Sequence, residues 1–280
     1  MTVELGRYGI WRTQRALDPE LAVEVEALGY GAIWVGGSPP GDLALVESML
    51  DATQRIAVAT GIVNMWSTPA EEVAASYQRI EAKHPGRFLL GVGIGHPEAT
   101  KEYRSPYATM VDYLDRLDEA GVPVAGRALA ALGPKALRLS ADRTAGAHPY
   151  LTTPQHTRAA REVLGTGPLL APEQKVVLEA DPERARAIGR PPVARPYLQL
   201  VNYTNSLKRL GWTDDDIADG GSDALIDALA VHGGAAAVAA GLTAHLDAGA
   251  DHVCAHVLSA DGDPLPTLRA LADVLRLRRP

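Results

Sequence analysis

Cysteine is almost absent from this chain of 280 residues. Cys254 is the only one, and it lies inside an apolar run. A single cysteine cannot form a disulfide within the chain, and this suits a reducing compartment, so we expect a cytoplasmic protein. The first residues, MTVELGRYGIWRTQ, also lack the basic and apolar segments of a signal peptide.

Long hydrophobic runs and concentrated positive charge are missing as well. No apolar stretch approaches the ~18 residues of a membrane-spanning helix, so we expect no membrane partner. Lys and Arg number 27 against 34 Asp and Glu, and no basic cluster marks a face for nucleic acid. Aromatic residues make up 5% of the chain, with a single Phe, which gives no support to a protein-docking patch. The expected partner is a small-molecule substrate.

Several catalytic motifs are also absent. The histidines show no zinc spacing such as HExxH, and the chain has no Walker loop, GxSxG or GxGxxG motif. His252 and His256 are four residues apart in a predicted strand, where they share a face, but the sequence shows no carboxylate paired with them. We therefore expect no metal site, and we interpret Cys254 as a small core residue.

The chain does have a regular alternation of short apolar runs and helical patterns. Eight strand-like runs, each followed by a helical pattern, favour an α/β fold, a single (β/α)8 TIM barrel over residues 1–280. A long series of helical patterns runs from residue 182 to about 246, and its part near residues 190–232 predicts a helical insertion before the last strand. The alternative is an open doubly wound sheet with fewer strands. The predicted strands are residues 9–11, 32–35, 56–63, 88–94, 127–132, 147–151, 174–179 and 249–257.

The fourth strand-like run, GRFLLGVGIGHP, ends in glycines and a histidine. Gly91, Gly93 and Gly95 are two residues apart and share one strand face. Such glycines indicate either close approach by a ligand or tight packing inside the barrel. His96 would lie at the rim where barrel active sites are found, and an unperturbed pKa near ~6.5 suits a proton donor. The alternative is that His96 only caps the loop before Pro97.

A second informative stretch is Leu132-Gly133-Pro134-Lys135, where a predicted strand leads directly into a helix. Gly133 permits a tight turn, and Pro134 suits the first helical turn because it has no amide hydrogen to leave unpaired. The free amides behind it, together with Lys135, predict an anion site for a phosphate or carboxylate. An ordinary strand-to-helix junction is the alternative.

Taken together, these stretches resemble the luciferase-like family of flavin and deazaflavin oxidoreductases. The resemblance runs along nearly the whole chain through LGYGAIWVGGSP, ATGIVN, GRFLLGVGIGHP and LGPKALRLSADRTAGAHPYLTTPQHTRAAREVLG. The later stretches LLAPEQKVVLEAD, NYTNSLKRLGW, GGSDALIDAL and AGADHV are similar to an actinobacterial subgroup of probable coenzyme F420-dependent oxidoreductases.

The resemblance implies a barrel that holds coenzyme F420, or FMN as the alternative, at its C-terminal mouth. A hydride would pass between C5 of the deazaflavin and an unidentified small organic substrate. A cis peptide bond at Gly61-Ile62 would support the cofactor ring, Gly93 and Gly95 would make room for it, and its phosphate would meet Gly133-Pro134-Lys135. Dimers are common in the family, so the resemblance also implies a homodimer.

The residue pattern departs from that of the family's sugar-phosphate dehydrogenases. These enzymes carry a carboxylate where this chain has His96, and an acid and a histidine where it has Gly37 and Ser38. We expect His96 to act as acid or base, and Ser38 and Trp66 to border the substrate, although packing is an equal alternative for Trp66. An FMN-dependent monooxygenase and a non-catalytic ligand-binding barrel remain alternative functions.

Overall fold

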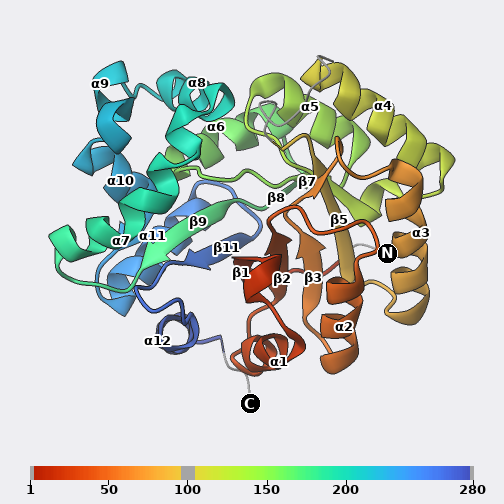
Figure 1. The fold of residues 1–280 in the computed structure, drawn as a ribbon, viewed down its shortest axis with the longest axis horizontal. Coiled ribbons are helices and arrows are strands. Elements are labelled where there is room, and N and C mark those ends of the chain that lie inside the picture. Colours follow the sequence, from red (N-terminus) through yellow and green to blue (C-terminus); the bar gives the residue numbers. More distant parts are fainter. Residues whose placement is uncertain (1–2, 96–104, 278–280) are drawn as a thin grey trace.

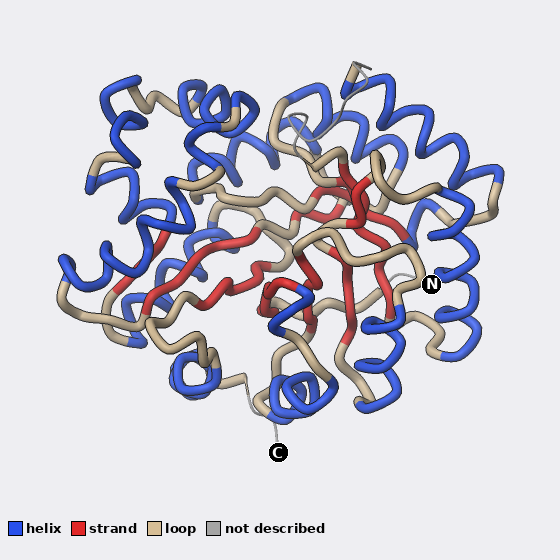
Figure 2. The backbone as a smooth tube through the Cα atoms, in the orientation of Figure 1, coloured by secondary structure: helices blue, strands red, loops and turns tan. Residues whose placement is uncertain are grey.

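Parallel strands form the centre of the computed structural model, which describes residues 3–95 and 105–277. Every strand pair in it is parallel. The strands follow one another side by side in the order β10-β9-β11-β1-β2-β3-β5-β6-β7-β8, and Figure 2 shows them as the inner layer with the helices outside. Their bounds are β1 Tyr8–Thr13, β2 Ala32–Gly36, β3 Ala57–Thr60, β5 Phe88–Gly93, β6 Arg127–Leu129, β7 Gly146–Ala147, β8 Leu169–Leu170, β9 Glu173–Val177, β10 Ala230–His232 and β11 Val253–Val257.

The segment that contains β8 and β9 closes the ring. β8 pairs with β7 and β9 pairs with β11, and only Ala171 and Pro172 separate β8 from β9. Hydrogen bonds continue on both sides of the break, because Ala171 N donates to Ala147 O and Cys254 N donates to Pro172 O. When β8 and β9 are counted as one strand, eight strands of the described residues form the ring of the barrel that the sequence predicts, and β10 pairs with β9 beside it.

Helices cover the outside of the barrel in the expected alternation (Figure 1). The Asp18 carboxylate caps the first helix by accepting a hydrogen bond from Leu21 N, and Pro19 occupies the first helical position. The bounds are α1 Pro19–Ala27, α2 Ala44–Ala52, α3 Ala70–Lys83, α4 Pro106–Glu119, α5 Pro134–Arg143, α6 Pro154–Leu164, α11 Ala235–Asp247 and α12 Leu265–Leu275.

The predicted insertion lies between β9 and β11 and is helical apart from β10. Its helices gather on one side of the barrel in Figure 1, next to the C-terminal end of β9. They place a cluster of buried apolar side chains, including Leu198, Leu207 and Ile226, beside the barrel mouth. The bounds are α7 Pro182–Ala194, a 3-10 helix Tyr197–Gln199, α8 Val201–Arg209, α9 Asp214–Ile217 and α10 Asp223–Leu229.

Several predicted strands are shorter in the structure, among them those over residues 127–132 and 249–257, which are β6 and β11. Residues 56–63 were expected to be continuous, but β3 ends at Thr60 and a short strand β4, Val63–Asn64, follows beside β5. The intervening Gly61-Ile62 peptide bond is cis, as the resemblance implied. The sixth strand, expected over residues 147–151, ends at Ala147. Pro149, two residues later, has no amide hydrogen to donate to a strand ladder.

The main apolar core lies between the barrel and its helices, and a smaller core fills the barrel interior. Alternating small and large residues line that interior, with Trp11 and Trp34 beside several alanines. Within the described part of the chain, no helix is both long and apolar enough to cross a lipid bilayer. The arrangement leaves the C-terminal ends of the strands open beneath α8.

Candidate active site at the barrel mouth

A cavity of about 490 Å³ opens at the C-terminal ends of the barrel strands. One side is backbone and small side chains that follow β2, β3, β5 and β6, and the other is α8 with the aromatic residues after β7. This is the position where barrel enzymes bind their substrates. Its lining residues are Trp11, Thr13, Gly37, Ser38, Gly61, Ile62, Asn64, Ile94, Gly95, Met110, Ala130, Ala131, Leu132, Gly133, Ala136, His148, Tyr150, Tyr197, Asn202, Tyr203, Asn205 and Arg209.

The backbone between β3 and β4 forms one wall of the cavity. The Trp11 indole Nε1 donates a hydrogen bond of 3.2 Å to Gly61 O, which fixes this wall to β1. A Cβ at Gly61 would lie 2.8 Å from Trp11 Nε1 and 2.9 Å from His148 Nε2. Glycine is therefore required by the two side chains packed beneath it, and the peptide plane stays accessible from the cavity.

His148 is a buried residue of the cavity wall that the sequence analysis did not single out. Its side chain stacks on Trp34, with ring centroids 3.9 Å apart, and Nδ1 lies 2.7 Å from Ala171 O. Because a carbonyl only accepts, Nδ1 carries the proton and Nε2 is an acceptor. Burial lowers the pKa of His148 to about 4, so the ring is neutral at pH 7. Nε2 has no hydrogen-bond partner among the described residues.

The start of α5 provides unpaired amide groups beside a guanidinium group. Gly133 is the N-cap and makes no side-chain capping bond, and both Gly133 and Ala136 line the cavity. Arg209 Nη2 lies 3.7 Å from the position that a Gly133 Cβ would take. No ion pair or hydrogen bond of Arg209 occurs among residues 3–95 and 105–277. Helix N-termini and arginine both favour anions, so the two groups together could bind an anion at the mouth.

A polar face of α8 points into the cavity. Asn202, Asn205 and Arg209 follow the i, i+3, i+7 spacing that puts side chains on one side of a helix. That spacing is visible in the stretch NYTNSLKR and could have identified these residues from the sequence. The cation expected from the sequence, Lys135, is exposed and does not line the cavity.

The structure brings together about half of the predicted site residues. Ser38, Gly61, Ile62, Gly95 and Gly133 line the same cavity although they come from four different strand ends. His96 lies outside the described residues. The predicted residues that do not line the cavity are Gly93, Pro134, Lys135 and Trp66.

The glycines of the β5 stretch divide between the two interpretations of the sequence. A Cβ at Gly91 would lie 1.8 Å from Thr60 O, and one at Gly93 would lie 2.8 Å from Ala130 Cβ. Barrel packing is therefore sufficient to require small residues at these two positions. Gly95 differs, because it has a positive φ of 57°, follows the strand and lines the cavity.

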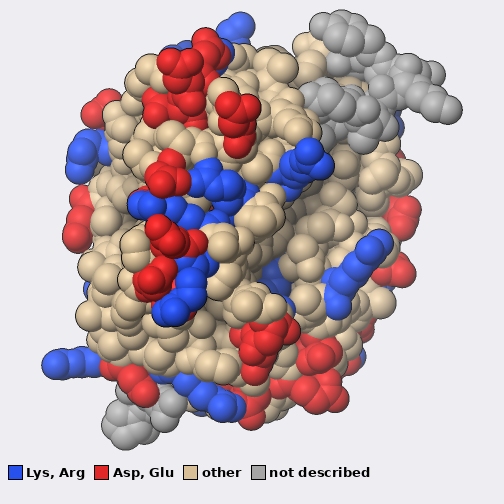
Figure 3. Space-filling view, turned by 60° about the vertical axis from the view of Figure 1, so that its left-hand side comes forward, with Lys and Arg blue, Asp and Glu red and all other residues tan. Residues whose placement is uncertain are grey.

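Ion pairs hold the insertion that carries α8. Arg186 pairs with Asp227 at 2.6 Å and with Asp223 at 2.9 Å, and Arg190 also pairs with Asp223, joining α7 to α10. Figure 3 shows acidic and basic side chains intermingled on the face that it turns forward, next to a hollow. These pairs are partly exposed, and such pairs are individually weak.

A cluster of buried charged groups lies inside the barrel, behind the aromatic wall of the cavity. The fully buried carboxylate of Glu173 has Oε1 2.9 Å from Lys175 Nζ and 2.9 Å from His256 Nδ1. Its other oxygen accepts a hydrogen bond of 3.0 Å from Leu151 N. Lys175 Nζ also lies 4.0 Å from the centre of the Tyr150 ring, a cation–π contact. The Glu173 carboxylate therefore has an opposite charge beside it, and both of its oxygens have hydrogen-bond partners.

Two pKa directions follow from this arrangement. Burial alone would raise the pKa of Glu173, but Lys175 and His256 together lower it to about 2. Burial lowers the pKa of Lys175, and the charge of Glu173 opposes that shift. The 2.9 Å contact between them is that of an ionised pair.

The expectation that His252 and His256 lack a paired carboxylate is wrong for His256. Its partner, Glu173, is 83 positions away in the sequence and comes from the adjacent strand β9. Spacing along one strand cannot reveal such a partner. In the described part of the chain, no group of three or more His, Cys, Asp or Glu side chains could hold a metal ion.

Comparison with solved structures places the fold among known proteins. An F420-dependent secondary alcohol dehydrogenase in complex with an F420–acetone adduct is 15% identical and superimposes with a TM-score of 0.74, covering 100% of both chains. The coenzyme F420-dependent tetrahydromethanopterin reductase from Methanopyrus kandleri is 13% identical, with a TM-score of 0.66 over 97% of this chain and 98% of that one.

A flavin enzyme gives a similar match. The oxygenating constituent of 3,6-diketocamphane monooxygenase from Pseudomonas putida, in complex with FMN, is 14% identical, with a TM-score of 0.70 over 95% of this chain and 97% of that one. At these identities the matches establish the fold alone. A search of curated protein sequences found no match.

A family model matches part of the sequence. Residues 18–121, from the cap of α1 to the end of α4, match the luciferase-like monooxygenase family. This part of the chain contains Ser38, the Gly61-Ile62 peptide and the glycines of β5. The actinobacterial subgroup stays a prediction. The resemblance is confirmed over residues 18–121, which match the luciferase-like monooxygenase family, and along its length the chain shares the fold of the solved structures.

Proposed function

We propose that this chain is an oxidoreductase that holds coenzyme F420 in the 490 Å³ cavity and exchanges a hydride between it and a small organic substrate. The observation that carries the proposal is the anion site formed by Arg209 and the uncapped start of α5, on the rim of that cavity. F420 and FMN both carry a phosphate group and a planar tricyclic ring. A cavity with a flat wall and an anion site at its mouth fits such a molecule.

The residues present fit a deazaflavin in three respects. Because Gly61 has no side chain, the Gly61-Ile62 peptide offers a flat surface against which a ring can lie. Arg209 and the amides of Lys135 and Ala136 would bind the phosphate. His148 Nε2 is a buried acceptor that lacks a partner among the described residues, so it would accept a hydrogen bond from the ligand. When bound, the coenzyme supplies a hydride at C5.

We assign the proton-transfer role to His96. It directly follows Gly95, which lines the cavity, but His96 itself lies outside the described residues, so the assignment stands on its position in the chain. General acid–base catalysis contributes ~10²–10⁴-fold, and His96→Ala should lower turnover by that factor with little change in cofactor affinity. His96→Gln should fail almost as badly. Substantial rescue by Gln would mean that His96 only caps the loop.

Ser38 and Trp66 were both assigned to the substrate pocket. Ser38 lines the cavity after β2, and we retain it as a substrate contact. Trp66 does not line the cavity, and its buried Nε1 has no partner among the described residues. Packing is the simpler role for Trp66.

The choice of F420 over FMN is supported by the sequence stretches shared with F420-dependent oxidoreductases. The solved structures include both F420-dependent and FMN-binding proteins at similar TM-scores, so the choice rests on those sequence stretches. The test is a fluorescence titration of the purified chain with each cofactor, because Trp11 lines the cavity and its emission should change when a ring binds. Tighter binding of FMN would reject F420, and binding of neither would favour a non-catalytic barrel.

A further inference from the structure

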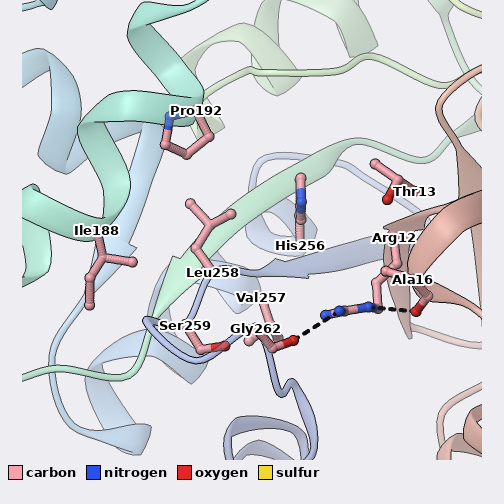
Figure 4. Close-up of a pocket in the computed structure, with 10 residues that line it drawn as sticks. All are labelled: Arg12, Thr13, Ala16, Ile188, Pro192, His256, Val257, Leu258, Ser259 and Gly262. Atoms are coloured by element: carbon pink, nitrogen blue, oxygen red, sulfur yellow. Dashed lines mark hydrogen bonds between the residues drawn. The ribbon is translucent and has the colours of Figure 1, made fainter.

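A second cavity, of about 260 Å³, lies beside the first one. Figure 4 shows it between the ends of β1 and β11 on one side and α7 on the other. Ile188, Pro192 and Leu258 make one part of its wall apolar, while Arg12 lies at the opposite end. Thr13 lines both cavities, so they adjoin at the end of β1.

Arg12 is the cationic side chain of this second cavity. Its Nε donates a hydrogen bond of 3.1 Å to Ala16 O, and Nη2 donates one of 3.0 Å to Gly262 O. Both acceptors are neutral carbonyl groups, and they hold the guanidinium in place without compensating its charge. A guanidinium has five N–H donors, so three remain.

The charge of Asp263 acts on Arg12, but its carboxylate makes no ion pair with the guanidinium. Asp263 is close enough to raise the pKa of Arg12 against the lowering caused by burial. Its Oδ1, however, accepts a hydrogen bond of 2.9 Å from Leu265 N at the start of α12. No carboxylate lies within ion-pair distance of Arg12 among residues 3–95 and 105–277. A half-buried arginine that makes no direct ion pair, and on which Asp263 acts only from a longer distance, favours an anionic ligand.

His256 separates this cavity from the buried charged cluster. Its Nδ1 faces Glu173 at 2.9 Å, and its ring packs against Trp11, with centroids 4.4 Å apart. The carboxylate of Glu173 is thereby kept behind the imidazole and away from the cavity. The surface that a ligand would meet is apolar except for Arg12, His256 and the hydroxyl groups of Thr13 and Ser259.

We propose that the second cavity binds a small, partly apolar carboxylate, with the Arg12 guanidinium on the carboxylate group and the Ile188–Leu258 side against the apolar part. The volume of about 260 Å³ leaves room for a ligand of about the size of benzoate. The site is independent of the proposed cofactor, because none of its charged groups belongs to the anion site at α5.

Calorimetric titration of the full, cofactor-free chain with benzoate and with benzamide tests the proposal. The two probes have nearly the same shape and differ in charge. Benzoate should bind at least about tenfold more tightly, the scale of a charge-assisted hydrogen bond. Equal affinity for the two probes, or no binding of benzoate, would overturn the proposal even if F420 binds as proposed above.

Variants locate the binding. Arg12→Gln should weaken benzoate binding by about tenfold or more, and Arg12→Lys, which keeps the charge, should weaken it less. Leu258→Trp should block the site by filling its apolar part. Arg15→Gln, in the same segment but outside the cavity wall, is the matched control and should bind benzoate normally.

The variant Arg209→Gln distinguishes benzoate binding in the second cavity from binding in the larger one. It removes the cation of the larger cavity and should leave benzoate affinity unchanged. Loss of benzoate binding in Arg209→Gln but not in Arg12→Gln would place the probe at the barrel mouth and overturn the proposal. If Arg12→Gln does not fold, Leu258→Trp and Arg12→Lys still decide it, because unchanged binding in both would also overturn it.

Discussion

The two walls of the large cavity are built on opposite physical principles. The wall after β3, β5 and β6 consists of backbone and small residues such as Gly61, Gly95 and Gly133, which leave peptide groups accessible to a ligand. The wall after β7 carries Tyr150, whose ring covers the buried pair of Glu173 and Lys175. One side makes room for a ligand, and the other side keeps charges out of water.

Because of this difference, one wall should mainly affect folding stability and the other should mainly affect ligand binding. A buried charge pair contributes little net stability when it is complete, but it becomes costly when one member is lost. The wall after β3, β5 and β6 has the opposite property. A substitution there should change stability little where no atom lies close to the new side chain, but it should change which ligands can enter the cavity. Mutations on the aromatic wall should therefore change stability, and mutations on the rim should change ligand affinity.

The largest expected effect is the loss of folding stability at acidic pH. Burial lowers the pKa values of His148, His245 and His252 to about 4 from 6.5. The unfolded chain takes up these protons first, so stability is complete above pH 6.5 and is lost as pH falls towards 4. Each histidine lowers the free energy of unfolding by about 1.4 kcal/mol per pH unit in this window.

Urea unfolding at a series of pH values measures this loss. His148→Gln removes one titrating group and should reduce the slope by about 1.4 kcal/mol per pH unit. Glu173, with its pKa lowered to about 2 from 4.5, adds a further loss below pH 4.5. A free energy of unfolding that stays constant from pH 6.5 to 4.5 would contradict the burial of these rings.

The next effect concerns the buried pair itself. Lys175→Met should lower the free energy of unfolding by about 3–5 kcal/mol, because it leaves Glu173 charged and buried without its partner. The double variant Glu173→Gln/Lys175→Met should recover part of that loss. Lys135→Met, at an exposed position, is the control and should change stability by less than about 0.5 kcal/mol. Additive effects in the double variant would mean that the pair is not coupled.

A glycine comparison tests the other wall. Gly91→Ala should lower stability by about 1–3 kcal/mol or more, because its Cβ would meet Thr60 O in the barrel wall. Gly133→Ala should cost less than about 1 kcal/mol, since its φ is −91° and its nearest neighbour is 3.7 Å away. Thermal unfolding of the two variants measures both. Similar losses would contradict the division of glycines between packing and ligand approach.

The sequence predicted the barrel because the signal is local. Each strand-like run and each helix start, such as Asp18-Pro19, can be recognised from neighbouring residues, and their alternation defines the fold. The glycines at the strand ends were recognised for the same reason. Gly91 and Gly93 show the limit, since their spacing does not reveal whether a ligand or the next strand approaches them.

Long-range partners could not be predicted in this way. The run QKVV was expected to be an ordinary strand, and the charge of Lys175 is accommodated only because Glu173 and Tyr150 are brought beside it by the barrel. Similarly, the cation of the anion site comes from α8, 76 positions from Gly133. Lys135 was preferred in the sequence because it is adjacent, whereas proximity in the fold favours Arg209.

The smallest expected effect is a change in F420 affinity, and it shows whether Arg209 or Lys135 binds the phosphate. Arg209→Gln should weaken F420 binding by about 1–3 kcal/mol, the scale of a charge-assisted hydrogen bond, while thermal stability without cofactor stays nearly constant. Lys208→Gln is the matched control, because it removes the same charge from the adjacent position of α8, where Lys208 pairs with Asp214. Lys135→Ala should have the weaker effect, since its side chain is exposed and does not line the cavity. Fluorescence titration with F420 compares the three variants. If Lys135→Ala lowers the affinity and Arg209→Gln does not, the phosphate binds at Lys135, the cation close to Gly133 in the sequence, and not at Arg209.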